Sequence, residues 1–374
     1  MPVTQKDIAR ELGVSVMAVH RALSGSGYVS CRLKERILAH AARVNYRPHR
    51  GAQALVRNRL RRLALFSVES PSFFWDDVAV GIRAALDQAA PFGYAGTYRR
   101  IPAGDTDRYL RVVRAALREG ADAVALVNNY EFDMGRVFRL LEESRIPYLM
   151  FNIDAPGSGR SCFIGPDYCL QGRLAADFVG KVLSGSGKVG ILFSDVPAAL
   201  KSGTQGISSQ RRHGFTDYLE EHYPRIRAEV QAIDHALPER TIRRRILDYL
   251  GRARGLDALY CVPPYSLLAG HCLQESGRAG RTSLVTFDLY PELKALIEAG
   301  VVTGTICQKP VQQGYYAVRI LEQILESKAP PASEEFHISP HVVVRANVDV
   351  EEDLFTINRM LAGSFPGPCA TAAS

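Results

Sequence analysis

The sequence has 374 residues, 47% of them hydrophobic, and a formal net charge of +7. No apolar run approaches the roughly 18 residues of a membrane span, and no apolar signal core follows a basic start. A cytoplasmic protein is therefore expected. The seven cysteines form no CxxC pair and match no zinc spacing, which predicts reduced thiols and no metal site.

The positive charge is concentrated in the first sixth of the chain. Residues 1–62 contain 13 Lys and Arg against 3 Asp and Glu, whereas the remaining residues contain 33 against 36. This asymmetry indicates an anionic partner for the first segment, either nucleic acid or a membrane surface. The alternative is a solvated basic surface with no partner.

Residues 1–47 are expected to form three short helices. Thr4 precedes Asp7 by three residues, which predicts a capped helix start, and Gly13 ends that helix. Ser15 is expected to cap the second helix and Ser30 the third. The side chains that should face inward at helical spacing are Ile8, Ala9, Leu12, Val19, Leu23, Leu33, Ile37, Ala41 and Val44.

Two short helices joined at a glycine turn and braced by a third are typical of a helix-turn-helix. The second helix of such a unit enters the major groove with its N-terminal residues against base edges. Arg21 on this helix can donate two hydrogen bonds to guanine, and Val16 and Met17 suit a thymine methyl.

The chain changes character after this head. Residues 48–62 are a linker with weak helical character and a basic run. From Leu63, apolar strand-like runs alternate with amphipathic helices, which predicts parallel α/β units in two doubly wound lobes. Residues 362–374 are small and rich in Pro and Gly, and are expected to be disordered.

The segment VTQKDIARELGVSVMAVHRALSGSGYVS, with RPHRGAQAL after it, resembles the N-terminus of the lactose-repressor (LacI/GalR) family. The resemblance implies a homodimer that places two heads on a pseudo-palindromic operator. The chain departs from the family's VSxxTVSRxLN pattern at Ala18, His20 and Ser24, and His20 either donates to a phosphate or has no role. The residues assigned to DNA binding are Thr4, Lys6, Ser15, Val16, Met17, Ala18, His20, Arg21, Ser24, Tyr28, Ser30, His49, Ala52, Leu55 and Arg57.

In this family the linker folds into a hinge helix only when it pairs with its dimer mate on DNA, and a leucine from each hinge enters the minor groove. The matching residue is Leu55; the alternative is a linker residue packed on its own domain. Gly51 costs such a helix up to about 1 kcal/mol relative to Ala, so an isolated hinge should be disordered.

Residues 63–361 resemble the type I periplasmic-binding-protein fold of the ribose type. The resemblance implies an N-lobe of about 63–163 and 309–336 and a C-lobe of about 164–308 and 337–361. A ligand would bind between them at the C-terminal ends of the strands. Aromatic faces would contact the sugar ring, and planar polar groups its hydroxyls. The expected effector-binding residues are Phe73, Phe74, Trp75, Asn128, Asn152, Asp154, Arg211, Tyr265, Asp288 and Gln308.

One departure affects this site. The family often has Asn-Asp after its sixth strand, where this chain has Cys261-Val262-Pro263-Pro264-Tyr265. An amide ligand is lost, and Tyr265 is expected to enter the pocket instead. The Phe73-Phe74-Trp75 loop and the Asn152-Ile153-Asp154 strand end resemble the branch that binds pentoses, polyols or inositols.

The sequence therefore favours a sequence-specific transcriptional regulator, and a repressor in particular, whose operator affinity is controlled by a small sugar or polyol. The alternatives are a stand-alone sugar-binding protein and a sugar-modifying enzyme. No acid and base pair is singled out for catalysis, and no cofactor, metal or membrane partner is expected. Residues 185–190 fit GxGxxG, but the expected order of helix then strand predicts a simple turn. The sequence does not identify the effector, the operator sequence or the sign of regulation. It favours a dimer over a tetramer without deciding between them.

Overall fold

Three helices form the N-terminal unit: α1 (Gln5–Leu12), α2 (Val16–Ser24) and α3 (Cys31–Arg43). The computed structural model describes residues 3–24, 28–44, 59–102, 104–129, 132–194 and 206–349. Thr4 and Asp7 form a reciprocal capping box at α1, and Gly13 ends this helix with a left-handed φ of 66°. The Ser15 hydroxyl accepts a hydrogen bond from the Ala18 amide at 3.1 Å and so caps α2. The predicted caps of the first two helices are confirmed.

One small core holds these helices together. Ile8, Val19 and Ile37 come from the three different helices and are fully buried against one another. Ala9, Ala22 and Ala41 complete this core, and the other apolar residues of the predicted stripes pack around it. The helical periodicity therefore identified the buried side of each helix correctly.

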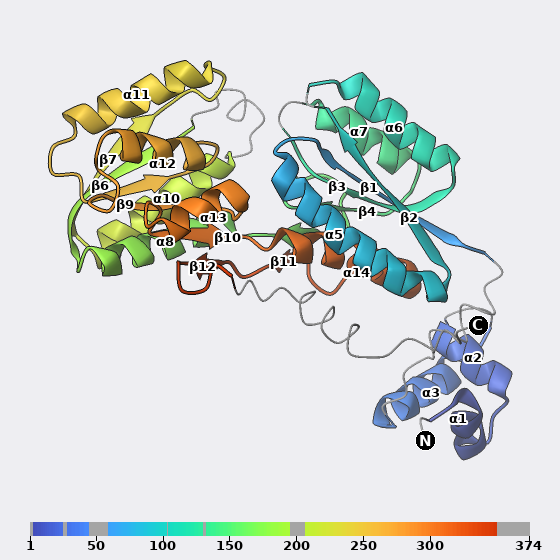
Figure 1. Ribbon diagram of the computed structural model, residues 1–374. Coiled ribbons are helices and arrows are strands. Elements are labelled where there is room, and N and C mark those ends of the chain that lie inside the picture. The colour runs from blue at the N-terminus through green and yellow to red at the C-terminus, as the bar shows by residue number, and fades with distance from the viewer. Residues whose placement is uncertain are drawn as a thin grey trace, which may run out of the picture. The chain divides into compact units, whose positions relative to one another are not determined.

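The first lobe of the α/β unit is built on a six-stranded sheet in the order β11-β5-β4-β3-β1-β2. Its strands are β1 (Arg61–Val68), β2 (Tyr94–Ile101), β3 (Ala121–Leu126), β4 (Tyr148–Phe151), β5 (Phe163–Gly165) and β11 (Glu335–His337). Helices α5 (Ser72–Ala89) and α14 (Pro310–Ser327) cover one face, and α6 (Thr106–Arg118) and α7 (Met134–Glu143) cover the other (Figure 1). A short 3-10 helix, η1 (Ala90–Phe92), follows α5.

The second lobe repeats this plan with a sheet in the order β12-β10-β9-β8-β6-β7. Its strands are β6 (Ser186–Phe193), β7 (Arg225–Ala232), β8 (Ala258–Cys261), β9 (Ser283–Phe287), β10 (Gly304–Cys307) and β12 (His341–Val343). Helices α8 (Tyr168–Val182) and α10 (Ile207–His222) pack on one face. Helices α11 (Glu239–Arg252), α12 (Ser266–Glu275) and α13 (Pro291–Glu298) pack on the other. Only β12 pairs antiparallel among the strand pairs described.

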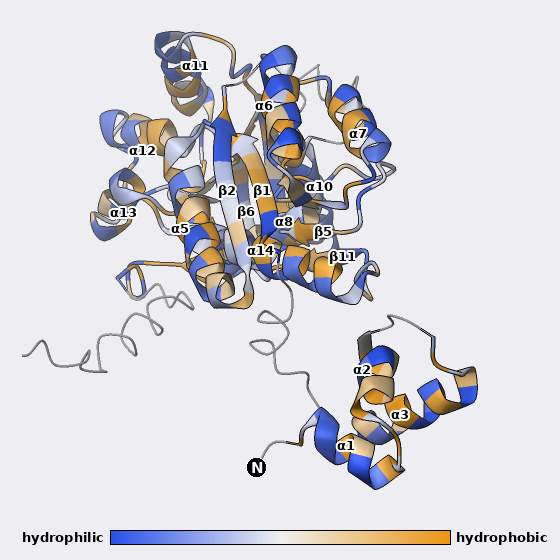
Figure 2. Ribbon diagram, turned by 90° about the vertical axis from the view of Figure 1, so that its right-hand side faces the viewer, coloured by the Kyte–Doolittle hydropathy of each residue, from blue (hydrophilic) through white to orange (hydrophobic). Residues whose placement is uncertain are grey.

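Central strands of both sheets are buried on both faces, as parallel strands between two helical layers must be. Every residue of β4, β8 and β10 is buried. The helices instead carry hydrophobic and hydrophilic bands along their length, whereas β1 is largely hydrophobic (Figure 2). The expected fold class, a helical head followed by two doubly wound sheets, is confirmed.

The chain crosses between the two sheets three times, at residues 166–167, 308–309 and 338–340. The loops at the C-terminal ends of the strands from both lobes line one cleft. The glycine-rich segment 185–190 follows α8, as predicted, but the turn itself is confined to residues 183–185, and residues 186–190 already belong to β6.

Both lobes pack two helices against each other through a pair of glycines. An added Cβ on Gly81 of α5 would lie 1.9 Å from the Val311 oxygen of α14, and one on Gly314 of α14 would lie 2.2 Å from the Val78 oxygen of α5. In the second lobe, an added Cβ on Gly172 of α8 would lie 2.1 Å from the Arg211 oxygen of α10, and one on Gly214 of α10 would lie 2.1 Å from the Cys169 oxygen of α8. No side chain fits at these crossings, so glycine sets the closeness of the helices.

Candidate functional site

Helix α2 presents an exposed surface that is apolar at its N-terminal end and basic at Arg21 in its last turn. Met17 is 58% exposed, and Val16 and Arg21 are exposed as well, while Val19 points into the helical core. Ala18 and His20 are half-buried, and Thr4, Lys6, Ser15, Tyr28 and Ser30 are exposed. The side chains predicted to meet base edges are therefore accessible.

The structure does not describe the side chains of five residues predicted to bind DNA. The side chain of Ser24, and His49, Ala52, Leu55 and Arg57, lie outside the described residues. The same is true of the tail at 362–374. Of the exposed head residues, Thr4 and Ser15 also have a structural role, because their hydroxyls cap α1 and α2.

A cleft of about 1020 Å³ lies between the two lobes of the α/β unit. It is lined at the C-terminal ends of β1, β3 and β4 on one side and of β6, β8, β9 and β10 on the other. Nine of the ten residues predicted to bind the effector line this cleft: Phe73, Phe74, Trp75, Asn128, Asn152, Asp154, Arg211, Asp288 and Gln308. The structure thus brings together residues that are up to 235 positions apart, from Phe73 to Gln308.

Arg211 lines the cleft from the first turns of α10, and the part of the cleft formed by Arg211, Asp288 and Gln308 is called its inner end here. Its side chain is held by Gln171, whose Oε1 accepts from Arg211 Nε at 2.8 Å, and by the Phe287 ring, whose centroid is 4.0 Å from the guanidinium carbon. The residue is only 4% exposed, yet its Nη2 has no hydrogen-bond partner within the described part of the chain. Such a buried donor is unsatisfied until a ligand or water accepts from it.

Asp288 and Gln308 follow β9 and β10 of the same lobe and line the cleft near Arg211. Gln308 Nε2 donates to Asp288 Oδ1 at 2.6 Å, which leaves the buried Gln308 Oε1 as an acceptor without a donor among the described residues. Burial raises the pKa of the Asp288 carboxyl, whereas the Arg211 charge and the Gln308 hydrogen bond lower it. The inner end therefore combines one cation, one carboxylate and two unsatisfied polar atoms.

Two cleft residues at strand ends have left-handed backbones. Asn152 after β4 has a φ of 60°, and Asp288 after β9 has a φ of 67°. Asn and Asp adopt this region more readily than most residues. The Asn152 amide donates to Gln313 Oε1 at 2.9 Å, and its carbonyl accepts from the Tyr168 hydroxyl at 2.8 Å. The Tyr168 contact joins the two lobes beside their first crossover.

Aromatic side chains form one wall of the cleft. The Phe73 ring stacks on the Tyr290 ring of the other lobe, with centroids 4.2 Å apart. Phe74 and Trp75 are almost completely buried, and Trp75 packs edge-on against Phe151 while its Nε1 donates to the Ser70 carbonyl at 3.1 Å. The expected loop at these residues is the first turn of α5, which begins at Ser72. That expectation was wrong because Phe74, Trp75 and Val78 are at helical spacing and share one buried face.

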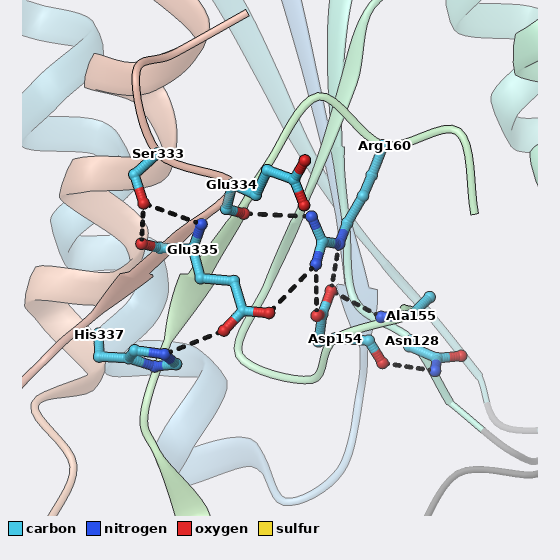
Figure 3. A network of polar contacts seen from close by, with 8 residues as sticks. All are labelled: Asn128, Asp154, Ala155, Arg160, Ser333, Glu334, Glu335 and His337. Atoms are coloured by element: carbon cyan, nitrogen blue, oxygen red, sulfur yellow. Dashed lines mark hydrogen bonds and ion pairs between the residues drawn. The ribbon is translucent and has the colours of Figure 1, made fainter. Parts of the chain in front are cut away.

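Asp154 is committed to a polar network rather than free in the cleft (Figure 3). Its carboxylate pairs with Arg160 through Nε at 2.6 Å and Nη2 at 2.8 Å, and it accepts from the Ala155 amide. Arg160 also donates to the Glu334 carbonyl at 3.1 Å and lies 3.6 Å from the Glu335 carboxylate. Glu335 in turn pairs with His337 at 3.1 Å. The network fastens the end of β4 to β11, the strand that precedes the third crossover.

The prediction that Tyr265 enters the pocket is corrected by its placement. Tyr265 is 2% exposed, belongs to the core under α11 and α12, and donates its hydroxyl to the Ile233 carbonyl. Its neighbours Pro263, Pro264 and Ser266 line the cleft instead. In the turn after β8, Pro264 and Ser266 line the cleft, whereas Tyr265 between them points into the core.

Several cleft residues were not predicted from the sequence. They are Tyr168, Ser194, His235, Tyr290, Glu335 and His337. Tyr168 and Tyr290 lie next to the N-terminal ends of α8 and α13, and Glu335 and His337 lie on a strand of three residues. The position of Tyr290, two residues after Asp288 at a strand end, was a usable signal; nothing local marks the other five.

This arrangement defines a class of protein: a helix-turn-helix head joined to a two-lobed small-molecule-binding unit. Two family models match the chain in the same order. The bacterial regulatory proteins of the lacI family match residues 4–49, and the periplasmic binding protein domain matches residues 64–329. The chain belongs to the periplasmic binding protein domain family and carries a lacI-family DNA-binding domain at its head.

Individual relatives agree with this assignment. A probable HTH-type transcriptional repressor, ExuR of Bacillus subtilis (strain 168), is 26% identical over 234 residues, which are 61% of this chain and 63% of ExuR. The ribose operon repressor of the same strain is 32% identical over 108 residues, covering 29% and 31% of the two chains. This chain thus spans less than two thirds of the length of these relatives.

A solved structure shows the same fold. The sugar-binding protein of a sugar ABC transporter from Bacillus halodurans superposes with a TM-score of 0.67 at 20% identity, covering 77% of this chain and 99% of that one. In the part of the chain that the structure describes, no helix is long and apolar enough to cross a membrane.

Proposed function

We propose that the chain is a transcriptional repressor that binds pseudo-palindromic operator DNA as a homodimer. A small sugar or polyol bound in the cleft changes its operator affinity. One observation carries this proposal: a single chain joins an exposed reading helix to a cleft with unsatisfied buried polar side chains. The relatives named as repressors and the sugar-binding structural neighbour support the two halves of the proposal.

The coupling follows from the three crossovers between the lobes. Ligand contacts on both sides of the cleft favour one degree of lobe closure over others. Lobe closure in a dimer alters the spacing of the two linkers at residues 48–62, and this spacing decides whether a hinge helix forms on DNA. Leu55 is the residue proposed to enter the minor groove.

The operator half is tested by selecting duplexes from a random pool with the full chain and measuring their affinity by fluorescence anisotropy. Arg21→Ala should weaken operator binding by about 1–3 kcal/mol, the usual contribution of a bidentate contact to guanine. Binding to unrelated DNA should fall much less, because phosphate contacts carry it.

Arg136→Ala is the matched control, because it removes one arginine from an exposed ion pair with Asp107 on the outer helices of the first lobe. It should leave operator affinity unchanged. Failure to enrich any sequence would contradict the repressor and favour a stand-alone sugar-binding protein. Equal losses on operator and unrelated DNA would remove Arg21 from base reading.

A further inference from the structure

We propose that the effector is an uncharged polyhydroxylated molecule and that the cleft discriminates against sugar acids and sugar phosphates. The inference rests on the proposed function, in which the cleft binds the effector, and adds the charge class of that effector. Two observations support it: the unsatisfied hydrogen-bond donor and acceptor at the inner end, and the charges of the side chains that line the walls of the cleft.

The inner end requires a ligand group that both donates and accepts. Arg211 Nη2 is a buried donor without a partner, and Gln308 Oε1 is a buried acceptor without a partner among the described residues. A hydroxyl can accept from the first and donate to the second. An ionised carboxylate or phosphate only accepts, so it would leave Gln308 Oε1 unsatisfied in a buried site.

The hydrogen bond from Arg211 to Gln171 limits how Arg211 can bind a carboxylate. The Nε edge of its guanidinium is already occupied by Gln171, and the Phe287 ring covers one face. A bidentate pair through Nε and Nη2 would require the Gln171 hydrogen bond to break. Nη2 keeps its N–H groups for a ligand, and a hydroxyl oxygen can accept from one of them.

Asp288 lies close enough to Arg211 for the two charges to interact. Burial raises the pKa of the Asp288 carboxyl, and the charge of Arg211 and the Gln308 hydrogen bond offset part of this increase. A second anion placed at the inner end would face the Asp288 carboxylate in surroundings of low polarity, where repulsion between like charges is strong. Asp288 can instead accept a hydrogen bond from a neutral hydroxyl, which adds no charge.

In the described part of the chain, the wall that faces these residues has one guanidinium, and it is already paired. Two carboxylates, Asp154 and Glu335, share the single guanidinium of Arg160, whose remaining donor is directed at the Glu334 carbonyl (Figure 3). Among the described residues, four carboxylates line the cleft, those of Asp154, Asp167, Asp288 and Glu335, together with the guanidinium of Arg211. Arg160 does not line the cleft but pairs with Asp154 and Glu335, so two guanidinium groups face four carboxylates in all. The excess of two negative charges repels anionic ligands.

The test compares uncharged carbohydrates with their charged counterparts on the full chain. Thermal shift and calorimetric titration would use ribose, arabinose, glucose, galactose, mannitol and myo-inositol. Their charged counterparts would be ribose 5-phosphate, arabinose 5-phosphate, glucuronate, galacturonate, mannitol 1-phosphate and myo-inositol 1-phosphate. We expect an uncharged compound to bind best and its acid or phosphate to bind at least about tenfold more weakly, which corresponds to roughly one unfavourable charge contact.

An acid or phosphate that binds more tightly than its uncharged counterpart would overturn the inference. Absence of binding by every uncharged compound would overturn it as well. Operator binding by the ligand-free protein is measured separately, so loss of DNA binding would contradict the repressor while leaving the charge selectivity of the cleft intact.

A pair of variants tests the electrostatic cause. Asp288→Asn keeps the side-chain volume and removes the charge, so the preference for the uncharged compound should fall by about tenfold. Asp107→Asn, whose side chain is 68% exposed outside the cleft, should leave the preference unchanged. If Asp288→Asn does not fold, Glu335→Gln on the opposite wall is expected to reduce the preference in the same direction. An unchanged preference in a folded cleft variant would overturn the electrostatic explanation.

Discussion

Arg160 shows how one side chain can organise a binding site without facing the ligand. Its side chain is 8% exposed, and it joins Asp154 at the end of β4 to Glu335 in β11. Asp154 was predicted as a direct ligand of the effector. The structure adds that the orientation of this carboxylate is set by Arg160, so substitutions at Arg160 should act through Asp154.

Arg160→Ala should lower the free energy of unfolding by about 3 kcal/mol, because it leaves the partly buried Asp154 carboxylate unpaired. Arg136→Ala breaks an exposed pair instead and should cost less than about 1 kcal/mol. Chemical denaturation of both variants measures the difference. Equal and small losses would show that the Arg160 network adds little to stability.

Helix crossings through glycine pairs position the inner end of the cleft. Gly172 and Gly214 allow α8 and α10 to approach until their backbones touch, and α10 carries Arg211 while α8 carries Gln171, its hydrogen-bond partner. The geometry of the Arg211 site is therefore a property of the helix pair. The first lobe repeats the device with α5 and α14, although its glycines do not border an arginine of the cleft.

Gly214→Ala should reduce the free energy of unfolding by at least about 2 kcal/mol, since the new methyl would overlap the Cys169 carbonyl. It should also reduce the thermal shift given by the best carbohydrate ligand. Gly251→Ala is a matched control in α11, where an added Cβ meets no atom within 4 Å. That control should be neutral or stabilising by up to about 1 kcal/mol. A Gly214→Ala protein as stable as wild type would show that the crossing can widen freely.

At the scale of the whole molecule, the two binding activities must be linked. If the effector changes operator affinity by some factor, the operator must change effector affinity by the same factor. Calorimetric titration of the effector with and without saturating operator duplex measures one side, and anisotropy with and without effector measures the other. If the two affinities changed by different factors, the effector and the operator would not be coupled through one dimer. If neither affinity changed, the proposed regulation would be wrong.

Much of the fold could be predicted because its signals are local. The caps at Thr4 and Ser15, the turn at Gly13 and the helical stripes depend on residues within a few positions of one another. The central strands were recognisable as continuous apolar runs. β2 and β7 have no continuous apolar run to mark them in the sequence, because they lie at sheet edges and most of their residues are half-buried or exposed. β5, β11 and β12 have only three residues each, which is too short for a recognisable pattern.

The candidate site likewise has features that local sequence predicts and features that depend on contacts between distant residues. The sequence by itself determined which strand ends would carry polar and aromatic side chains, because parallel sheets place these ends together. Only the tertiary structure decided that Tyr265 lies in the core, that Asp154 is held by Arg160, and that Arg211 is seated by a helix crossing. Each of these outcomes depends on a partner distant in sequence, as the Asn152–Gln313 bond across 161 residues illustrates. Local patterns determine what a segment becomes, whereas packing between distant segments determines where each of its side chains points.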